Sequence, residues 1–566
     1  MGLLWPDKDE DKARHSLNEA LRVVRRSLGT ALETEGDTIR IGAGAVASDA
    51  DHLDDLPVEA LGLRFMEGFV VPDAGEFDGW VALERDGVQA RQLGVLARRG
   101  ESALDSGDHA GARAAAQAAL GLDPANEPAA RLAMRAAALG GRRASALEAF
   151  EQLRTALAGL GLTPDKASRL LAERIRDERI VPQAPAPAPS GADLPLGGSA
   201  RQGMAELAAR WTAAARGAAQ VVALVGDPGT GKTRLAVELA ARARLDGATV
   251  LRLRAVPGET SRNGWSALLR DAFAEPALAG LAPAALASLA ELEPDISVRF
   301  PAARSAAPLP LPDATQAALR ALAEDRALLV ILDDAQYAPA DFLSELSRVV
   351  EQGRSLPVLL LLVAVGKDSN ALDAVRARIG RDLPGAALAT VALSPGDVDE
   401  LVSVAFPAYS AAQRQRLARR IMADTAGNPF LATELVRAVR SGLTIPDTPA
   451  AWPSAKHTLD DTLPGDLPPS VAAALRMRFR ELTPSAQQVL VAIAVLGPGA
   501  AESRIARGIE LPPPDVSRAL DELEWGRWIV ADPRGYSFAT RLAREVVLAD
   551  MVTGGQQRRI REGAGQ

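Results

Sequence analysis

One segment near the middle of the chain limits its fold more than any other feature. Residues 226–233 read Gly-Asp-Pro-Gly-Thr-Gly-Lys-Thr, directly after the apolar residues 221–225 and before a stretch with a helical pattern. Glycines let the backbone curl so that successive N–H groups point at one anion, which the dipole of the following helix also favours. This strand–loop–helix, the Walker A pattern, predicts a phosphate-binding loop on an α/β sheet.

The residues of this loop have separate expected roles. Lys232 can reach the β- and γ-phosphates of a nucleoside triphosphate, and the hydroxyl of Thr233 can ligate Mg²⁺. ATP or ADP with Mg²⁺ is therefore the predicted ligand, and Lys232 is also predicted to be catalytic. The loop residues expected to contact the nucleotide are Gly226, Asp227, Pro228, Gly229, Thr230, Gly231, Lys232, Thr233 and Arg234.

Two adjacent carboxylates follow another buried-strand pattern. Residues 328–332 are apolar and lead directly into Asp333 and Asp334. A carboxylate at a strand end can support Mg²⁺, so we expect Asp333 to hold the metal together with Thr233. Asp334 would polarise the attacking water and is predicted to be catalytic. Adjacent aspartates can also form a simple turn, but after a Walker A loop they indicate phosphoanhydride binding and hydrolysis.

Strands and helices alternate through this part of the chain. Further apolar, strand-like runs occupy residues 249–254 and 358–365. Such alternation predicts a parallel sheet covered by helices on both faces. Lys367, just after the last of these runs, could sense a γ-phosphate or could be a surface lysine. The rest of the chain has a helical pattern and ends in a helix-plus-hairpin unit near residues 513–540.

The N-terminal third is mostly helical and contains a repeat. Gly107-Asp-His-Ala-Gly-Ala recurs as Gly141-Arg-Arg-Ala-Ser-Ala, and this offset of 34 residues is the period of a tetratricopeptide repeat. Each copy places a glycine turn before a helix with small residues on its packing face. An Ala-rich helical bundle would explain the same pattern. The Pro/Ala-rich residues 181–194 predict a linker to the α/β segment.

The first helix of the chain has a basic face. Residues 10–28 place apolar side chains at helical spacing, and Gly29 is the expected C-cap. Two short strand-like segments around a Glu-Gly-Asp turn follow, which is the pattern of the recognition helix and wing of a winged helix. The alternative, a solvated helix face, is favoured by these residues alone. The residues expected to contact DNA are Arg14, Arg22, Arg25 and Arg26.

Composition excludes several kinds of site. Cysteine is absent, so disulfides and thiolate metal sites are excluded, and the four histidines show no metal-ligand spacing. The net charge of −8 gives no global basic field, although one basic face could still bind nucleic acid. No targeting signal or apolar run of membrane length is visible, so we expect a cytoplasmic protein without a membrane partner.

The middle and C-terminal parts resemble known ATPases. Residues 226–236, 332–338 and the stretch Ala426-Gly-Asn-Pro-Phe-Leu are similar to an AAA-type ATPase of the STAND class, the signal-transducing ATPases of large bacterial regulators. In that class the proline of the last stretch packs near the adenine, which implies that Pro429 contacts the nucleotide. Residues 467–550 resemble the winged helix that follows such ATPases and locks their nucleotide state.

The N-terminal third resembles the bacterial transcriptional activator domain of SARP-type regulators. The matching residues include Leu4-Trp-Pro-Asp, Phe65-Met-Glu-Gly-Phe, Trp80 and the two repeats. In that family a winged helix binds DNA and the helical repeats contact partners. The resemblance therefore implies DNA and protein partners, RNA polymerase among them, and nucleotide-dependent oligomers.

Four departures from these families stand out. The elements that normally precede the recognition helix are missing, and the chain stops at Gln566 before the usual sensor array. Gly198-Ser-Ala replaces the Gly-Arg-Glu of the family, and Thr540 stands where a histidine often holds the ADP state. We therefore expect a product truncated at both ends.

These observations predict a multidomain α and α/β protein. The expected parts are a partial winged helix (1–55), TPR-like helical repeats of the activator domain (56–180), a linker (181–194), a P-loop α/β parallel-sheet ATPase core (195–395), a helical lid (396–460) and a C-terminal winged helix (461–566). The predicted function is transcriptional regulation switched by ATP and ADP, with slow Mg²⁺-dependent hydrolysis as a timer. The alternative is a STAND signalling ATPase or scaffold that acts through protein partners without contacting DNA.

Overall fold

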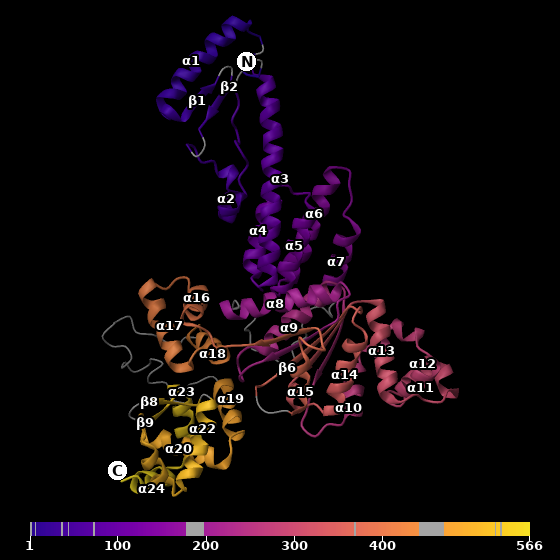
Figure 1. Ribbon diagram of the computed structural model, residues 1–566, viewed down its shortest axis with the longest axis vertical. Helices are drawn as coiled ribbons and strands as arrows, with labels where there is room; N and C mark the ends of the chain where they lie inside the picture. The colour runs from indigo at the N-terminus through magenta and orange to yellow at the C-terminus, as the bar shows by residue number, and fades with distance from the viewer. Residues whose placement is uncertain are drawn as a thin grey trace. The chain divides into compact units, whose positions relative to one another are not determined.

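The computed structural model describes residues 3–5, 7–35, 38–42, 45–71, 74–176, 197–366, 370–440, 469–526, 528–532 and 535–565. The chain divides into two compact units, Met1–Gln183 with Arg244–Gly247 and Ala184–Ala243 with Ala248–Gln566 (Figure 1). The predicted linker at 181–194 lies outside the described residues. Within the described ranges, every helix is too short or too polar to cross a membrane.

The N-terminal unit starts with the predicted helix and hairpin. Helix α1 (Glu10–Leu28) ends at Gly29, whose φ is 57°, and strands β1 (Leu32–Glu35) and β2 (Thr38–Ile41) pair antiparallel. In α1, which is described throughout, Ala13 is the one buried residue, and the apolar positions farther along the helix stay partly or fully exposed. This region therefore has little hydrophobic core of its own.

The remaining helices of this unit pack against one another in chain order. They are α2 (Val58–Leu61), α3 (Gly75–Asp105), α4 (His109–Leu122), α5 (Glu127–Leu139), α6 (Arg143–Gly159) and α7 (Lys166–Arg176). Gly107 and Gly141 form the predicted turns with φ of 75° and 73°, a conformation that glycine adopts without strain. Helices α3 and α5 approach closely at Gly100, where a Cβ would lie 2.3 Å from the side chain of Leu132.

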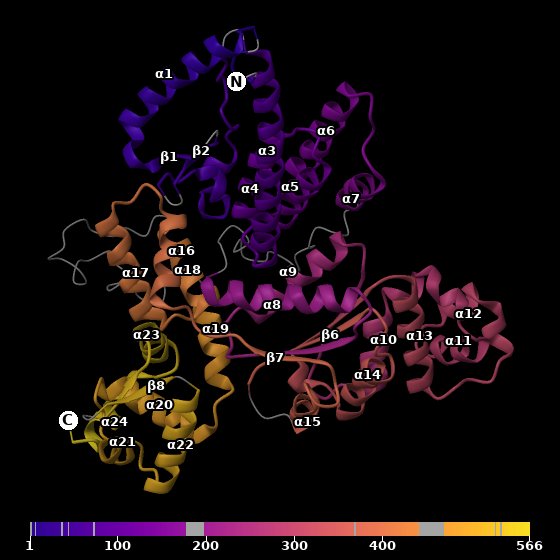
Figure 2. The ribbon, with the colours of Figure 1, turned by 45° about the horizontal axis from the view of Figure 1, so that its top comes forward.

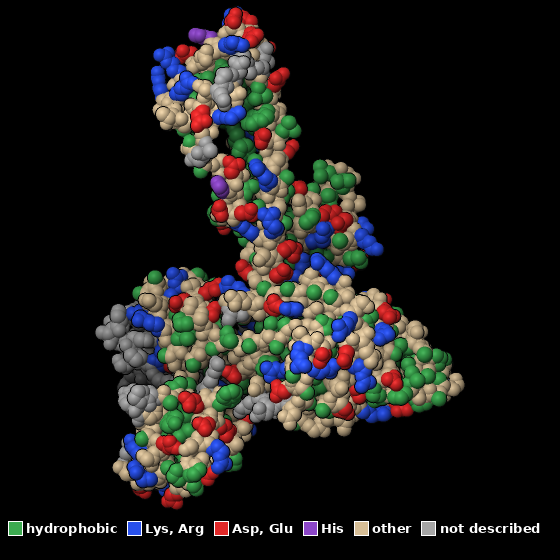
Figure 3. All heavy atoms as spheres, in the orientation of Figure 1, with side chains coloured by type: hydrophobic (Ala, Val, Ile, Leu, Met, Phe, Trp, Pro, Cys, Tyr) green, Lys and Arg blue, Asp and Glu red, His purple; other side chains and the backbone are tan. Residues whose placement is uncertain are grey.

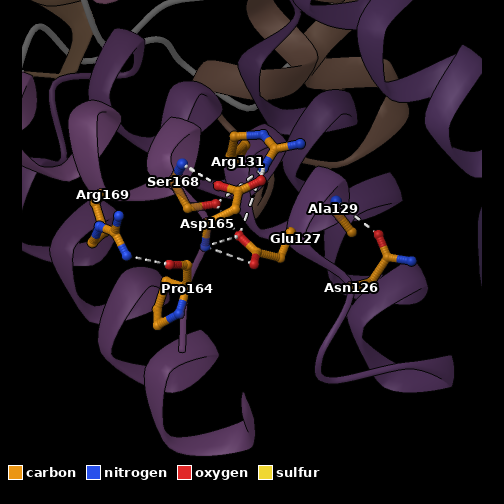
Figure 4. Close-up of polar contacts among 8 residues, drawn as sticks. All are labelled: Asn126, Glu127, Ala129, Arg131, Pro164, Asp165, Ser168 and Arg169. Carbon is orange, nitrogen blue, oxygen red and sulfur yellow. Dashed lines mark hydrogen bonds and ion pairs between the residues drawn. The ribbon is translucent and has the colours of Figure 1, made fainter. Parts of the chain in front are cut away.

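A polar network joins α7 to α5 (Figure 4). Asp165 accepts a hydrogen bond from the N–H of Ser168 (2.6 Å), and its own N–H donates to Glu127 (2.8 Å). Arg131 of α5 donates to Asp165 Oδ2 (2.8 Å) and to the hydroxyl of the buried Ser168 (3.0 Å). Desolvation raises the pKa of Asp165, but the hydrogen bonds from Ser168 and the charge of Arg131 outweigh it and hold this pKa below its ordinary value.

The second unit contains a five-stranded parallel sheet. Its strands are β3 (Gln220–Val225), β4 (Thr249–Arg254), β5 (Leu328–Asp333), β6 (Val358–Ala364) and β7 (Gly385–Ala389), in the spatial order β4-β5-β6-β3-β7. The sequence predicts the first four strands, but not β7, because a run of alanines has weak strand propensity. Gly385 permits the close pairing of β7 with β3, since a Cβ there would lie 1.8 Å from the carbonyl oxygen of Val221.

Helices cover both faces of the sheet, as the alternating pattern predicts (Figure 2). Trp211 of α8 (Gly198–Ala215) and Leu239 of α9 (Lys232–Leu245) pack on one face against side chains such as Val222. The helices that pack on or near the other face are α10 (Ser261–Leu269), α11 (Pro283–Ala290), α12 (Asp295–Arg299), α13 (Leu311–Asp325), α14 (Ala340–Gln352) and α15 (Asn370–Arg378).

In its described residues, the C-terminal part of the second unit is helical apart from one hairpin. Its helices are α16 (Pro395–Ala405), α17 (Ala411–Thr425), α18 (Pro429–Arg440), α19 (Pro469–Arg480), α20 (Pro484–Leu496), α21 (Glu502–Ile509), α22 (Pro513–Trp525), α23 (Arg541–Asp550) and α24 (Gly554–Gly563). Strands β8 (Ile529–Asp532) and β9 (Gly535–Phe538) form the predicted hairpin after α22. Leu435, Leu475 and Val489 belong to one hydrophobic core that extends from α16 to α24.

Candidate functional site

The Walker A segment forms a tight turn between β3 and α9. Gly229 and Gly231 have φ of 80° and 89°, a left-handed conformation that side chains other than glycine rarely adopt. Lys232 and Thr233 begin α9, and the first N–H groups of a helix have no acceptor within it. A left-handed turn followed by a helix N-terminus makes a concave set of N–H donors that suits a phosphate.

The carbonyl groups of this turn already have hydrogen-bond partners. Lys232 Nζ donates to the carbonyl oxygens of Gly226 (2.7 Å) and Asp227 (2.8 Å). The carbonyl oxygens of Pro228 and Gly229 accept hydrogen bonds from the N-terminal end of α18. Four successive carbonyls are therefore held in place, which fixes the conformation of the loop.

Lys232 is a buried cation. The residue is 8% exposed, and desolvation lowers its pKa, while the charges of Asp227, Asp334 and Asp333 partly offset that effect. A buried ammonium group is costly unless anions compensate it. A triphosphate beside Lys232 would provide that compensation, so the loop fits such a ligand.

Thr233 and Asp333 converge from α9 and β5. Thr233 Oγ1 lies 3.4 Å from Asp333 Oδ1, and the side chain of Asp333 is 7% exposed. A hydroxyl and a nearby carboxylate, with oxygens from phosphates, are ligands that Mg²⁺ accepts. In the part of the chain that the structure describes, no three His, Asp or Glu side chains gather as an alternative metal site.

Two arginines that the sequence analysis missed contact the predicted carboxylates. Arg252 Nη2 lies 3.1 Å from Asp333 Oδ2, and Arg254 Nε lies 2.7 Å from Asp334 Oδ2. The hydrogen bond to Asp334 raises the pKa of Arg254 above its ordinary value. Along β4, Arg252 and Arg254 alternate with buried leucines. Because side chains two residues apart in a strand lie on the same face, this alternation could have predicted that the two arginines lie side by side.

A cavity lies beside the loop in the second unit. Its lining includes Leu224, Thr230, Gly231, Arg234, Leu235, Thr390, Leu393, Asp397, Leu401 and Pro429. Apolar walls with a few polar groups are typical of a site for a base or another small ring. Pro429 and Arg234, both predicted to contact nucleotide, therefore border one cavity together with the loop.

Thr390 is another residue that sequence reasoning missed. Its Oγ1 lies 2.6 Å from Oγ1 of Thr230, and its N–H donates to the carbonyl oxygen of Val225 (2.8 Å). A Cβ on Gly226 would lie 2.1 Å from Thr390 Oγ1, so the first glycine of the loop is needed for this approach. No signal pointed to Thr390, because β7 itself was not predicted.

The first residue of α8 contacts the start of α16 through Asp397. The N–H of Gly198 donates to Asp397, whose carboxylate also caps α16 through Ser394. Desolvation raises the pKa of Asp397, but these hydrogen bonds and the charge of Arg201 outweigh it and lower the pKa. Ala200, which stands in the segment that departs from the family's Gly-Arg-Glu, lines the cavity without offering a polar side chain.

Thr540 has a local structural role. Its hydroxyl accepts a hydrogen bond from the N–H of Ala543 (3.2 Å) and caps α23. The predicted sensor Lys367 lies outside the described residues, so its role stays a prediction.

The predicted DNA contacts lie in the N-terminal unit. Arg14 pairs with Glu10 (3.0 Å), Arg22 with Glu19 (3.7 Å), and Arg25 donates to Thr34 (3.4 Å). Arg26 is also exposed. Figure 3 shows Lys and Arg side chains on the end of the unit that contains α1, with acidic side chains among them. These arginines share one helix, but ion pairs within α1 engage two of them.

Two family models match the chain. The model described as "Bacterial transcriptional activator domain" matches residues 42–176, and the model described as "AAA ATPase domain" matches residues 201–363. The first description suggests a transcriptional activator, and the second implies nucleotide binding and suggests nucleotide-dependent regulation. Comparison with curated proteins found no match.

Several solved ATPase structures share limited similarity with the chain. The ORC2 protein of Aeropyrum pernix has 16% identity and a TM-score of 0.40, and the match covers 69% of this chain and 98% of that one. The Walker-type ATPase of Pyrococcus abyssi has 16% identity and a TM-score of 0.35, with 58% and 90% covered. A STAND protein of Pyrococcus horikoshii with a tetratricopeptide repeat sensor has 13% identity and a TM-score of 0.26, with 63% and 44% covered.

Proposed function

We propose that this chain is a transcriptional regulator whose activity is switched by ATP and ADP. The observation that carries the proposal is the fixed phosphate loop with Lys232 inside it and the Thr233–Asp333 pair beside it. The loop lies in the segment that matches an ATPase family, and the same chain carries the match to an activator domain. A nucleotide site and an output domain in one chain are the two parts that such a switch needs.

The phosphates would bind at residues 226–233, with Lys232 against the β- and γ-phosphates. Thr233 and Asp333 would hold Mg²⁺, Asp333 through a water molecule. The base would occupy the cavity bordered by Arg234 and Pro429. Bound Mg²⁺ would supply charge stabilisation of the phosphates, while Lys232 orients them.

Hydrolysis would be slow and would serve as a timer. Asp334 is the residue proposed to orient the attacking water, yet its carboxylate accepts a hydrogen bond from Arg254 at 2.7 Å. An engaged carboxylate is a weak acceptor for a water proton. This ion pair supports a long-lived ATP state in preference to rapid turnover.

We propose that the predicted domains outside the ATPase core bind DNA and protein partners or stabilise a nucleotide state. Residues 1–55 would be a partial winged helix that meets DNA through Arg14, Arg22, Arg25 and Arg26. Residues 56–180 would be TPR-like repeats for protein partners, and residues 461–566 a second winged helix that stabilises one nucleotide state. The helix-plus-hairpin order of α1–β1–β2 and of α22–β8–β9 supports this division. Differential affinity for ATP and ADP would shift the population between an inactive and an active form.

An exposed apolar cluster favours the alternative, a signalling ATPase that acts through protein partners. The exposed fractions of Phe69 (48%), Trp80 (42%) and Leu83 (72%) are high for such side chains, and Phe77 lies between Phe69 and Trp80. Arg85 holds the preceding loop through hydrogen bonds to its carbonyl groups. A fixed apolar surface of this kind is typical of protein-binding sites.

Salt-dependent DNA binding separates the two functions. Fluorescence anisotropy with labelled promoter-length duplexes, at several salt concentrations, should show binding that weakens steeply with salt and differs between ATP and ADP. Equal binding with both nucleotides would contradict the switch. Absence of salt-sensitive binding, together with normal nucleotide binding, would leave the signalling ATPase as the better description.

A further inference from the structure

The stretch Ala426-Gly-Asn-Pro forms an unusual turn at the start of α18. Ala426 and Gly427 are both left-handed, with φ of 48° and 72°. A Cβ on Gly427 would lie 2.3 Å from the carbonyl oxygen of Leu393, and the N–H of Leu393 donates to the carbonyl oxygen of Gly427 (2.7 Å). This turn is therefore anchored to the segment after β7, and it delivers Asn428 to the phosphate loop.

The side chain of Asn428 makes two hydrogen bonds of different kinds. Its Oδ1 accepts from the N–H of Leu431 (3.2 Å), which caps α18, and its Nδ2 donates to the carbonyl oxygen of Pro228 (3.0 Å). Both partners are backbone groups of fixed polarity, so the orientation of the amide is unambiguous. The fit is tight, since a Cβ on Gly229 would lie 2.7 Å from Asn428 Oδ1.

A second hydrogen bond joins the same two segments. The N–H of Phe430 donates to the carbonyl oxygen of Gly229 (3.0 Å). In a trans peptide the C=O of one residue and the N–H of the next point in opposite directions. When the carbonyls of Pro228 and Gly229 face α18, the negative ends of these peptide dipoles are turned away from the site where a phosphate would bind.

We propose that Asn428 is a positioning residue that fastens α18 to the phosphate loop and thereby couples nucleotide affinity to the order of this helix. The inference rests on the proposed nucleotide site and adds a link between that site and the helical part that follows the sheet. Because Asn428 holds the carbonyl group of Pro228 outward, the loop loses less conformational entropy when a nucleotide binds. Because coupling between two equilibria is reciprocal, a bound nucleotide also orders the first turns of α18.

Substitutions at Asn428 can separate its two hydrogen bonds. Asn428→Ser keeps a good N-cap acceptor but removes the donor to Pro228, whereas Asn428→Ala removes both. We expect Asn428→Ser to weaken ATP and ADP binding by about 3- to 10-fold, the usual range for one lost hydrogen bond. Asn428→Ala should show the same loss of affinity and a lower melting temperature, because it also loses the cap. Isothermal titration calorimetry and thermal unfolding of the full chain measure these quantities.

Hydrogen exchange distinguishes a coupling role of Asn428 from a merely structural one, because only coupling makes the protection of α18 depend on bound nucleotide. At saturating ATP, exchange in both α9 and the first turns of α18 should slow in the wild-type chain. In Asn428→Ser the protection of α9 should persist while the protection of α18 by nucleotide falls.

The outcomes separate the inference from the proposed function. Wild-type affinity in Asn428→Ser, or undiminished protection of α18 in that variant, overturns the inference alone. Failure of the wild-type chain to bind ATP overturns both the proposed function and the inference.

Discussion

The phosphate loop and helix α1 carry the two sets of basic residues that the sequence analysis selected, and they are built differently. Lys232 is 8% exposed, and every carbonyl from Gly226 to Gly229 has a hydrogen-bond partner. Arg22, Arg25 and Arg26 are exposed on a helix in which one residue is buried. The loop owes its shape to contacts from Thr390, directly after β7, and from the start of α18, whereas α1 keeps its shape largely by local hydrogen bonds.

This difference determines how far the function of each motif can be deduced from the motif alone. A loop whose donors are already oriented loses little freedom when a ligand binds, so its chemistry can be deduced from its own geometry. An exposed amphipathic helix gains a defined role only from what covers its apolar side or meets its basic side. Four measurements test this contrast.

The largest effect is expected from Lys232→Ala. This substitution removes the cation placed for the phosphates, and ATP affinity should fall by ~100-fold or more, as for the loss of two charge-assisted hydrogen bonds. Titration calorimetry measures the affinity. An Arg22/Arg25/Arg26→Ala variant is the control and should bind ATP normally. Retained binding in Lys232→Ala would refute the assignment of the loop.

A smaller effect is expected from Asp333→Asn. The carboxylate of Asp333 lies 3.4 Å from Thr233 Oγ1, and its loss should weaken the Mg²⁺-dependent part of ATP binding by ~10-fold, the usual cost of a group that supports a metal through water. Binding measured in excess chelator should be the same in wild-type and variant chains. Equal Mg²⁺ dependence in both would contradict the proposed metal site.

The α1 arginines should have a more modest influence, on DNA binding. If Arg22, Arg25 and Arg26 each meet one phosphate, their replacement by alanine should reduce the slope of log affinity against log salt by about 2.7. Arg558, Arg559 and Arg561 on α24 are also exposed, and their replacement is the matched control because it removes the same charge. Equal slopes for the two triple variants would argue against α1 as the DNA-binding face.

The smallest effect is an alkaline pH dependence of nucleotide affinity. Desolvation lowers the pKa of Lys232 in the free site, and phosphates would raise it again, so binding takes up a proton at alkaline pH. Affinity should be constant below the free-site pKa and should fall as the pH rises through it. Titrations from about pH 7 to about pH 10 cover the range below the ordinary lysine value. A flat profile would indicate that Lys232 is not neutralised by burial.

Local sequence patterns predicted a large part of the fold. The apolar runs that became β3, β4, β5 and β6, the helix α1 and both hairpins carry periodicities that need no distant partner to be recognised. Gly229 and Gly231 could also be recognised from the local sequence, because the tight turn of the loop requires a left-handed backbone at these positions. The residues that the analysis missed, Thr390, Arg252 and Arg254, reach the site through strand pairing and side-chain direction.

By itself, the sequence determined that residues 226–233 form a phosphate-type loop with Thr233 and Asp333 as candidate metal ligands. Short-range geometry sets those features, because glycine conformation and strand-to-helix order act over a few residues. Only the tertiary structure decided that Thr390 and Asn428 hold this loop from segments 160 and 200 residues away. Such contacts depend on the order β4-β5-β6-β3-β7 and on the turn before α18, and hydrophobic packing of the whole unit selects both.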